Sequence, residues 1–535
     1  MLNQAEKCII SLSLVSCVFS SSYCLPFIDA TYDYVVIGSG TSGLAIAARL
    51  AATSSVSVAL VEAGGIIPGF AAIQATRTDL TDTDLVDWGF VTIPQVGAAN
   101  RKIHYARDKC LGGTSGRSFM AYHKPANNSL QKWVDLVGDG SYAFRNLLPY
   151  YEKICTLTAP NTRLRHFSWP NLASSLSIWV EQGLAAIGIK PGADFNSGSL
   201  SGSSWVPATI RLSGESRDSS GTSFLSLAIL CYYTNVASGL QVRQSFSPQS
   251  PQFLMVSGIG PSATLKSLGI KVISDLASVG QNMWDHVMLG SVYGVDVATS
   301  SRLTNDVAWA VESLVNYASG TGPLTAGGFG VIGWEKLPDA VRANLASATQ
   351  TALEAFPSDW SEVEYLALDG VLGYNYGSVA AAQVASLLRG NVTITSTDTN
   401  VALVINPNWL THPVDVKVAL ATFKRTRQVW APLNITIGDE CLPGPNVTND
   451  ADILNFIRNS AVQSSDSMAV VDSTARVFGV QNLRVVDVSI FPILPPGHPQ
   501  STCYMIAEKI AVNITSRPVV LKWSLVIMDR LYIMM

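Results

Sequence analysis

A histidine near the carboxyl end lies in a segment that can hold an imidazole rigidly beside a ligand. His498 belongs to residues 495–500, which read PPGHPQ and contain three prolines. Each proline fixes a backbone φ angle, so the direction of the histidine side chain is restricted. Imidazole has an ordinary pKa close to neutrality, which suits proton transfer. A lone histidine is more often a satisfied core residue, so the catalytic interpretation of His498 depends on the motifs around it.

A glycine-rich segment near the amino end has the spacing of a phosphate-binding turn. Residues 38–43 read GSGTSG and fit the pattern G-x-G-x-x-G. The first glycine permits a tight turn, the second lets a diphosphate approach the backbone, and the third lets a helix pack closely on a strand. A helix that begins here offers free N–H groups and the positive end of its dipole to phosphates. The predicted cofactor-binding residues of this turn are Gly38, Ser39, Gly40, Thr41, Ser42 and Gly43.

The segments on either side of this turn predict the unit that positions it. Residues 32–38 (YDYVVIG) and 56–62 (VSVALVE) are β-branched apolar runs, and residues 42–52 are an Ala-rich helix signal. Together they predict a βαβ unit. Glu62 ends the second strand, nineteen residues after Gly43, where a carboxylate can accept hydrogen bonds from ribose hydroxyls. The set predicts nucleotide binding but does not by itself separate FAD from NAD.

Further elements are predicted along the chain from periodicity and composition. Residues 301–335 and 337–376 read as mostly helical with Gly-rich interruptions, whereas residues 392–405 are rich in Thr and Val and should contain strands. The remaining predictions are helices at 413–430, 450–459 and 502–511, and a strand at 482–488.

Composition excludes several classes of function. The 35 Lys and Arg against 39 Asp and Glu give a net charge of −4, so there is no positive surplus for a nucleic-acid partner. An apolar share of 48% excludes a disordered chain. A chain of 535 residues is too long for a single hydrophobic core, so two or more domains are expected. None of the eight cysteines forms a C-x-x-C pair, so no structural zinc site or other metal site is expected.

The amino terminus has the pattern of a secretory signal. Lys7 precedes a short apolar run at 8–19 and small residues at 20–22, and the run is too short to span a bilayer. We predict a signal peptide over residues 1–24; the alternative is a buried N-terminal helix. Five sequons agree with a secreted glycoprotein, although sequons also arise by chance. They are Asn127, Asn391, Asn434, Asn446 and Asn513.

The carboxyl terminus is apolar but does not predict a membrane anchor. Residues 519–535 are interrupted by Lys522, Asp529 and Arg530, and charges are costly in hydrocarbon. We expect a packed final segment, no membrane span, and a location outside the cell or in the secretory pathway.

Five further segments, in order along the chain, complete a set of motifs. They are 107–125 (RDKCLGGTSGRSFMAYHKP), 247–270, 279–286 (VGQNMWDH), 405–416 (INPNWLTHPVDV) and 482–511. With the amino-terminal turn, they resemble the glucose–methanol–choline (GMC) oxidoreductases, in particular fungal secreted or secondary-metabolite members of the aryl-alcohol oxidase and patulin synthase type. The resemblance runs from about residue 32 to residue 511.

The resemblance implies an α/β (α+β) fold in which a Rossmann-like FAD-binding domain is interleaved with an antiparallel-sheet substrate domain. It implies an FAD region at 31–290 with a substrate-domain insertion at about 125–200, a mainly substrate-binding region at 300–450, and a C-terminal region at 451–515 that completes the FAD site. The implied reaction is oxidation of a small alcohol by hydride transfer to FAD, with oxygen or another electron acceptor as the second substrate.

The resemblance also assigns residues. His498 matches the second active-site position and is the expected catalytic residue, whereas His104, His123, His166, His286 and His412 are expected to be structural, His286 near the FAD. The loop along the flavin and diphosphate is matched by Gly112, Gly113, Thr114 and Ser115. The C-terminal cofactor-facing residues are Asp487, Val488, Pro499 and Gln500.

The chain departs from the family pattern in ways that put its activity in question. Relatives carry the principal histidine base before the C-terminal strand, but residues 450–483 contain no histidine. Segments 163–170 and 241–250 look shortened, and Ser118 stands where relatives usually have Asn. Either the translated sequence is mistaken or degenerate, or the protein has lost the oxidase chemistry. Three hypotheses therefore stay open: an FAD-dependent alcohol oxidase or dehydrogenase, a catalytically silent flavin-binding relative, and a non-redox cyclase on the same scaffold.

Overall fold

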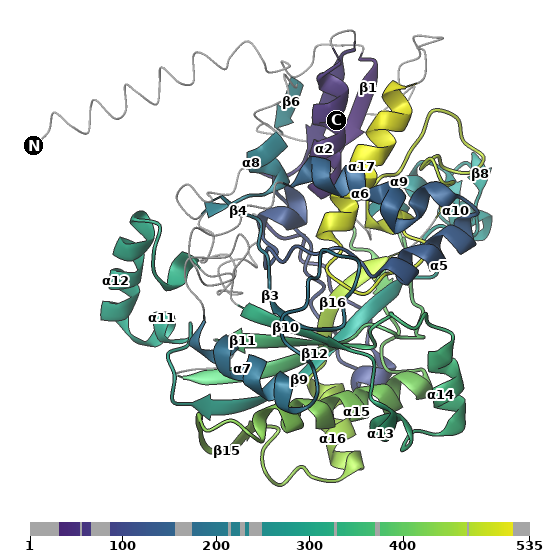
Figure 1. Ribbon diagram of the computed structural model, residues 1–535. Helices are drawn as coiled ribbons and strands as arrows, with labels where there is room; N and C mark the ends of the chain where they lie inside the picture. The colour runs from purple at the N-terminus through teal and green to yellow at the C-terminus, as the bar shows by residue number, and fades with distance from the viewer. Residues whose placement is uncertain are drawn as a thin grey trace, which may run out of the picture.

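The computed structural model (Figure 1) describes most of the chain between residues 32 and 516. The described residues are 32–53, 56–65, 86–155, 174–211, 216–224, 231–234, 249–325, 329–369, 375–467 and 470–516. The predicted signal peptide, the apolar C-terminal run, His166, segment 163–170 and most of segment 241–250 lie outside them.

The predicted βαβ unit is confirmed. Strand β1 (Tyr34–Ile37) pairs in parallel with β2 (Val58–Glu62), and helix α2 (Thr41–Ala51) joins them. A third strand, β6 (Cys231–Thr234), pairs in parallel with β2. A parallel pair requires a crossover connection, which α2 supplies with the buried apolar residues of its inner face.

The helix that ends the described chain packs beside this unit. Helix α17 (Gln500–Thr515) contacts α2 and α6 (Phe144–Ile154), as the upper part of Figure 1 shows. The buried carboxylate of Glu508 on α17 joins the three helices, because it lies 2.6 Å from Nε of Arg49 and 2.7 Å from Nζ of Lys153. At the other end of the two helices, the hydroxyl of Ser42 in the first turn of α2 donates to the carbonyl of Cys503 at 3.0 Å, which fixes the start of α17 beside the glycine turn.

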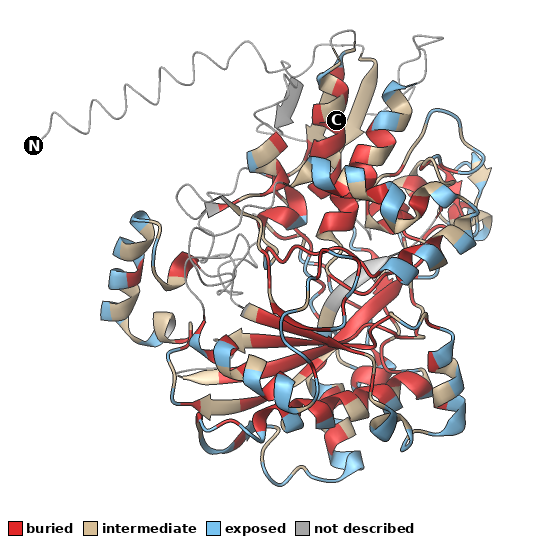
Figure 2. Cartoon of the chain, in the orientation of Figure 1, coloured by how far each residue is buried: buried red, intermediate tan, exposed pale blue. Residues whose placement is uncertain are grey.

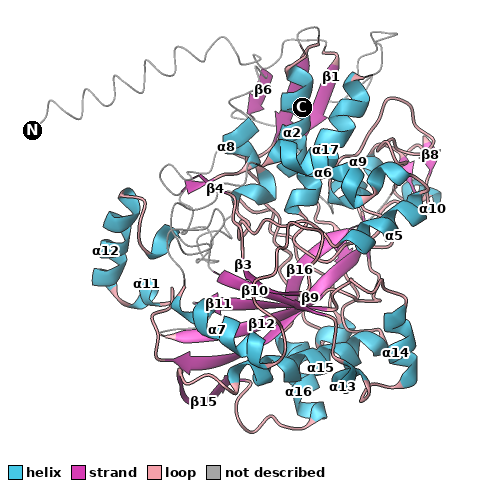
Figure 3. Ribbon diagram, viewed as in Figure 1, coloured by secondary structure: helices cyan, strands magenta, loops and turns pink. Residues whose placement is uncertain are grey.

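A large antiparallel sheet forms the lower half of the molecule (Figure 3) and confirms the predicted substrate-domain architecture. Its strand order is β15-β9-β12-β11-β10-β3, and β16 also pairs with β9. The strands are β3 (Gly202–Trp205), β9 (Trp284–Val295), β10 (Phe329–Glu335), β11 (Val363–Asp369), β12 (Tyr376–Gln383), β15 (Thr436–Leu442) and β16 (Val462–Ser467).

The two faces of this sheet are covered differently. Helices α7 (Ser175–Ala186) and α15 (Pro413–Trp430) pack on one face, and α16 (Asp450–Ser460) packs against α15. The other face is apolar and is covered by the chain between the two halves, which Figure 2 shows as largely buried. The apolar cluster on this face includes Ala121, Ala126, Phe195, Ile332, Trp334, Leu366, Ala380 and Ala382.

Further helices, strands and 3₁₀ turns complete the described part of the chain. They are α5 (Asn127–Val137), α8 (Ser220–Phe224), α9 (Gln249–Val256), α10 (Ser262–Ser267), α11 (Arg302–Asn305), α12 (Val307–Ala318), α13 (Asp339–Arg342), α14 (Ser347–Glu354), β4 (Ile210–Arg211), β5 (Ser216–Arg217), β7 (Ile259–Gly260), β8 (Ser274–Asp275), β13 (Asn391–Thr393), β14 (Val404–Asn406), and the 3₁₀ turns η1 (Val96–Ala98), η2 (Gly113–Gly116), η3 (Gly140–Tyr142), η5 (Pro323–Thr325) and η6 (Val488–Ile490). Among the described residues, no helix combines the length and apolar character needed to cross a membrane.

Two predictions of secondary structure are wrong. The ranges 301–335 and 337–376 contain α11, α12, α13 and α14, but they also contain strands β10 and β11. These strands are short apolar runs paired on both sides, and such runs lack the alternation that separates strands from helices. The strand expected at 482–488 is reduced to one isolated bridge between Arg476 and Arg484. The predicted helices at 413–430, 450–459 and 502–511 and the strands within 392–405 are confirmed.

Candidate active site

The first glycine turn has the geometry that its sequence predicts. Gly38 has a φ of +100°, in the region that favours glycine. A Cβ on Gly43 would lie 1.9 Å from the carbonyl oxygen of Gly38, so only glycine lets α2 pack this closely. Ser39, Thr41 and Ser42 are buried. Within the described residues, no side chain caps the helix at Gly40, and no acidic residue lies in its first turn.

This uncapped, buried helix start fits the diphosphate of FAD. The first N–H groups of a helix have no intrahelical partner, and the helix dipole places positive charge there. A buried helix start without a cap is costly unless a ligand supplies acceptors. The turn therefore has the donors, the field and the close backbone approach that a bound diphosphate needs.

Glu62 lies where the sequence predicts, at the end of β2, and contacts the glycine turn. Its Oε2 accepts hydrogen bonds from the backbone N–H of Ser39 (2.8 Å) and from the Ser39 hydroxyl (2.6 Å). Its Oε1 accepts from the N–H of Gly64 at 2.6 Å. Burial raises the pKa of Glu62 to about 7, against the lowering effect of these donors. A carboxylate oxygen can accept more than one hydrogen bond, so ribose hydroxyls remain compatible partners.

The second glycine loop lies directly against the first. The N–H of Gly112, which has a φ of +96°, donates to the carbonyl of Ser39 at 2.9 Å. The hydroxyl of Ser220 contacts the carbonyl oxygens of Gly40 (3.3 Å) and Gly112 (3.2 Å). The structure thus brings the predicted residues of both loops together. Ser220, which joins them, was missed because a serine in a polar run carries no distinguishing signal.

The remaining residues of the second loop divide between core and surface. The hydroxyl of Ser115 donates to the carbonyl of Gly112 at 2.6 Å and is buried. Gly113 begins the 3₁₀ turn η2 and is also buried, whereas Thr114 is exposed. Gly112, Gly113 and Ser115 are therefore the inward-facing members of the predicted set.

The C-terminal residues of the predicted site have separate surroundings. Asp487 caps η6 through the N–H of Ser489 (2.7 Å) and accepts from the hydroxyl of Ser250 on α9 (2.6 Å). Val488 begins η6. Pro499 is the N-cap residue of α17, and Oε1 of Gln500 accepts from the hydroxyl of Ser118 at 3.3 Å. The start of α17, next to His498, therefore contacts the second glycine loop.

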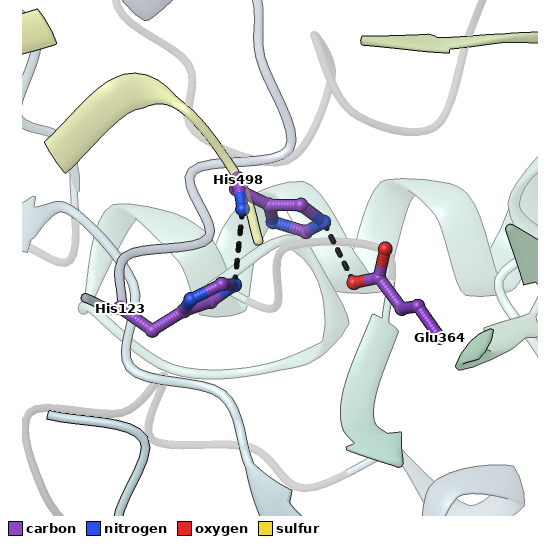
Figure 4. Close-up of side chains that lie close together, drawn as sticks. All are labelled: His123, Glu364 and His498. Carbon is purple, nitrogen blue, oxygen red and sulfur yellow. Dashed lines mark hydrogen bonds and ion pairs between the residues drawn. The ribbon is translucent and has the colours of Figure 1, made fainter. Parts of the chain in front are cut away.

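His498 is held between two side chains from distant parts of the sequence (Figure 4). Its Nε2 lies 3.0 Å from Oε1 of Glu364 on β11, and its backbone N–H donates to Nε2 of His123 at 3.2 Å. The side chain of His498 is 21% exposed and that of Glu364 is 2% exposed. This arrangement can accept a proton at His498 and stabilise the resulting charge with the carboxylate.

Glu364 was missed at the level of sequence. It pairs directly with Trp334 on β10 and Ala382 on β12, so the three side chains lie on the same face of the sheet. That face is the apolar one described above. In the sequence, the only sign of a special role for Glu364 is its charge inside the largely apolar run VEYLALD, because buried carboxylates are rare without a partner.

The three side chains of Figure 4 also have ligand types that a divalent metal accepts. Possible ligand atoms of His123, Glu364 and His498 lie within 4.8 Å of one another. Nε2 of His123 and Nε2 of His498 already have the partners named above. The hydrogen bond and the ion pair therefore account for the cluster without a metal.

Two of the other histidines have side-chain contacts, and a third is buried. His412 caps α15 through the N–H of Val414. Nε2 of His104 lies 3.2 Å from Oδ1 of Asp87. His286 is buried on β9, and burial lowers its pKa to about 3.

The comparisons with known proteins identify the family. A model of the GMC oxidoreductases matches residues 387–507. A dehydrogenase, pkfF of Emericella nidulans, is 44% identical, and the alignment covers 91% of this chain and 93% of that relative. This chain belongs to the GMC oxidoreductase family. As a member, it is an FAD-dependent oxidoreductase, in agreement with the fit of the glycine turns.

Other members support the same assignment. Patulin synthase of Aspergillus clavatus is 39% identical over 93% of this chain and 94% of its own. The solved structure of a fungal aryl-alcohol oxidase has the same fold, with a TM-score of 0.75 at 22% identity over 91% of this chain and 99% of that one.

The GMC relatives are longer in places than this chain. The alignment with pkfF extends over 572 residues, more than the 535 of this chain, so the relative has residues without a counterpart here. In the region where the principal histidine base is expected, α16 ends at Ser460, and β16 begins at Val462 and pairs with β9. The chain therefore passes from a surface helix into the sheet with one intervening residue.

Proposed function

We propose that this protein oxidises the CH–OH group of a small aromatic or polyketide-derived alcohol, in fungal secondary metabolism. The proposal is supported by the names of the similar proteins, a dehydrogenase and two patulin synthases. The observation that carries it is the ion pair between Glu364 on β11 and His498, which lies on the turn leading into α17. The start of α17 also contacts the second glycine loop through Gln500.

In the proposed mechanism, the two glycine turns would hold FAD, and the bound flavin would supply the acceptor for a hydride from the substrate carbon. His498 binds the substrate hydroxyl and takes its proton. A neutral imidazole has one acceptor nitrogen that can take this proton, and Nε2 of His498 lies 3.0 Å from Oε1 of Glu364. The Glu364 carboxylate then stabilises the imidazolium. The neighbouring side chains of Trp334 and Ala382 are fully buried, so they exclude water from the Glu364 carboxylate.

The direct test is reduction of the flavin in the purified holoprotein. The protein should retain a yellow flavin on dialysis, and its absorbance should bleach without oxygen on addition of an alcohol from a panel of aromatic and polyketide-like alcohols. His498→Ala should bind FAD and bleach slowly, whereas the control His412→Asn, which keeps a capping side chain on α15, should behave as wild type. Absence of bleaching across the whole panel would refute the proposal.

A catalytically silent flavin protein is the second candidate, and the absence of histidine from residues 450–483 favours it. It predicts bound FAD, no turnover, and turnover once a histidine-containing segment is restored between Ala461 and Gln463. The transcript across this position tests the other explanation, a mistaken translation. A cyclase would be recognised by its product, since cyclodehydration removes water and alcohol oxidation removes two hydrogens.

Secretion is proposed together with this function. The amino-terminal pattern and the sequons support it, and Asn434 and Asn446 are exposed. They flank β15 in the sequence, and β15 lies in the lower part of the molecule (Figure 1). In the sheet, β15 is separated by β9 and β12 from β11, the strand that carries Glu364.

A further inference from the structure

His123 joins the turn that carries His498 to the rest of the fold. It is completely buried in the segment between η2 and α5, and its Nε2 accepts the backbone N–H of His498 at 3.2 Å. Its carbonyl oxygen accepts from the hydroxyl of Ser501, in the first turn of α17. His123 therefore contacts this part of the chain twice, at His498 and at Ser501.

The segment around His123 is itself fixed. The N–H of Tyr122 donates to the carbonyl of Pro207, and the N–H of Lys124 donates to the carbonyl of Phe195. The imidazole packs edge-on against Trp334, with ring centroids 5.5 Å apart. An acceptor held from three sides in this way has little freedom to follow movements of the turn.

The turn is shaped to lie against this imidazole. Gly497 has a φ of +118°, and a Cβ added there would lie 2.4 Å from Cε1 of His123. The prolines on both sides of the Gly497–His498 pair have no N–H groups. The N–H of His498 is thus one of few donors in the turn, and His123 is its acceptor.

The hydrogen bond defines the state of the His123 ring. Because Nε2 accepts, the neutral imidazole has its proton on Nδ1. Burial and the nearby His498 lower the pKa of His123 to about 3, so it stays neutral across the physiological range. A protonated ring would place a second donor against the N–H of His498 and break the contact.

We propose that His123 is a positioning residue for the proposed reaction, which acts as a neutral acceptor to fix the backbone of His498. This role rests on the proposed function of His498 as the proton acceptor. It explains why a histidine is needed where packing alone would accept an apolar side chain, since the surrounding rings of Trp334 and Phe195 require only an apolar neighbour.

Two variants of similar length separate the acceptor from packing. His123→Gln keeps a strong acceptor near the position of Nε2, whereas His123→Met fills similar space with only a weak one. Both should retain FAD with an unchanged flavin spectrum. We expect roughly a tenfold lower rate of anaerobic flavin reduction in His123→Met, as for the loss of one buried hydrogen bond, and recovery to within about threefold of wild type in His123→Gln. Equal rates in the two variants would overturn the proposal.

A second measurement does not depend on turnover. In protein labelled with ¹⁵N-imidazole histidine, the signals of His123 are identified by their absence from His123→Gln. We expect a neutral ring with the proton on Nδ1 at every pH at which the protein is folded. A proton on Nε2, or an imidazolium at pH near 7, would overturn the inference. If wild type reduces no flavin, the proposed function fails, and this measurement still decides the state of His123.

Discussion

Replacing Glu364 by Gln tests the charge that faces His498. The change keeps the size of the side chain and removes its negative charge, so the sheet and the apolar face around Trp334 and Ala382 should persist. We expect binding of FAD and the melting temperature to change little, and reduction of the flavin by an alcohol to slow.

The magnitude follows from the geometry. Two unit charges 3.0 Å apart attract each other by about 5 kcal/mol at an effective dielectric constant of about 20. The cost of removing water from Glu364 and from most of His498 offsets part of this attraction. The net stabilisation of the imidazolium is then about 1.5–3 kcal/mol, the range for a hydrogen bond to a charged group. A factor of ten in rate corresponds to about 1.4 kcal/mol, so Glu364→Gln should slow the proton-coupled step roughly 10- to 100-fold.

The assay is anaerobic stopped-flow reduction of the bound flavin, with the best alcohol of the panel at saturating concentration. The matched control is Glu312→Gln, since Glu312 is an exposed carboxylate on α12. The loss should appear in the limiting rate of reduction and not in the control. A variant as fast as wild type would refute the assignment of Glu364 as the partner of His498.

Three further predictions concern the cofactor site and the surface. Burial raises the pKa of Glu62 from 4.5 to about 7, so between these values the folded apoprotein holds a proton that the unfolded chain has lost, and the stability due to Glu62 falls as the pH rises. Ribose hydroxyls favour the ionised carboxylate, so the affinity for FAD should increase with pH up to about 7, and binding should release a proton from Glu62. Calorimetry in buffers of different ionisation enthalpy detects this proton release. In Glu62→Gln, the affinity should no longer depend on pH in this range. Gly43→Ala should destabilise the protein by more than about 3 kcal/mol or prevent FAD retention, because the added Cβ would lie 1.9 Å from a carbonyl oxygen. In the control Gly140→Ala, the added Cβ meets no atom within 4 Å, so this variant should melt within a few degrees of wild type. In protein secreted from a eukaryotic host, peptide mass spectrometry should find glycans at Asn434 and Asn446, and unmodified peptides at both would contradict the secretion proposal.

The fold could be predicted where local pattern and tertiary structure agree. The βαβ unit has two β-branched strands, the first of which ends in glycine, and a helix with its apolar face inward, so its elements are predicted to within a few residues. Strands β10 and β11 could not be predicted, because their runs FGVIGWE and VEYLALD have no alternation, and VEYLALD also contains the good helix formers Glu, Leu and Ala. Their neighbours in the sheet, which are distant in sequence, decide their conformation.

The site was predictable only where residues form contiguous motifs. His498 and the two glycine turns belong to such motifs, and the structure brings the two turns into contact through Gly112 and Ser39. Glu364 belongs to no contiguous motif, and its ion pair with His498 forms only because β11 pairs with its neighbours in the sheet. His123 was expected to be structural, and nothing in its sequence surroundings shows that its ring accepts the N–H of His498.

The proposed mechanism requires that the turn carrying His498 faces the flavin that the two glycine turns would bind. A crystal structure of the purified holoprotein measures this directly. We predict the diphosphate at the start of α2 and the imidazole of His498 within hydrogen-bond reach of an alcohol placed against the flavin ring. A flavin ring separated from His498 by other side chains, or a diphosphate bound away from Gly38–Gly43, would contradict it.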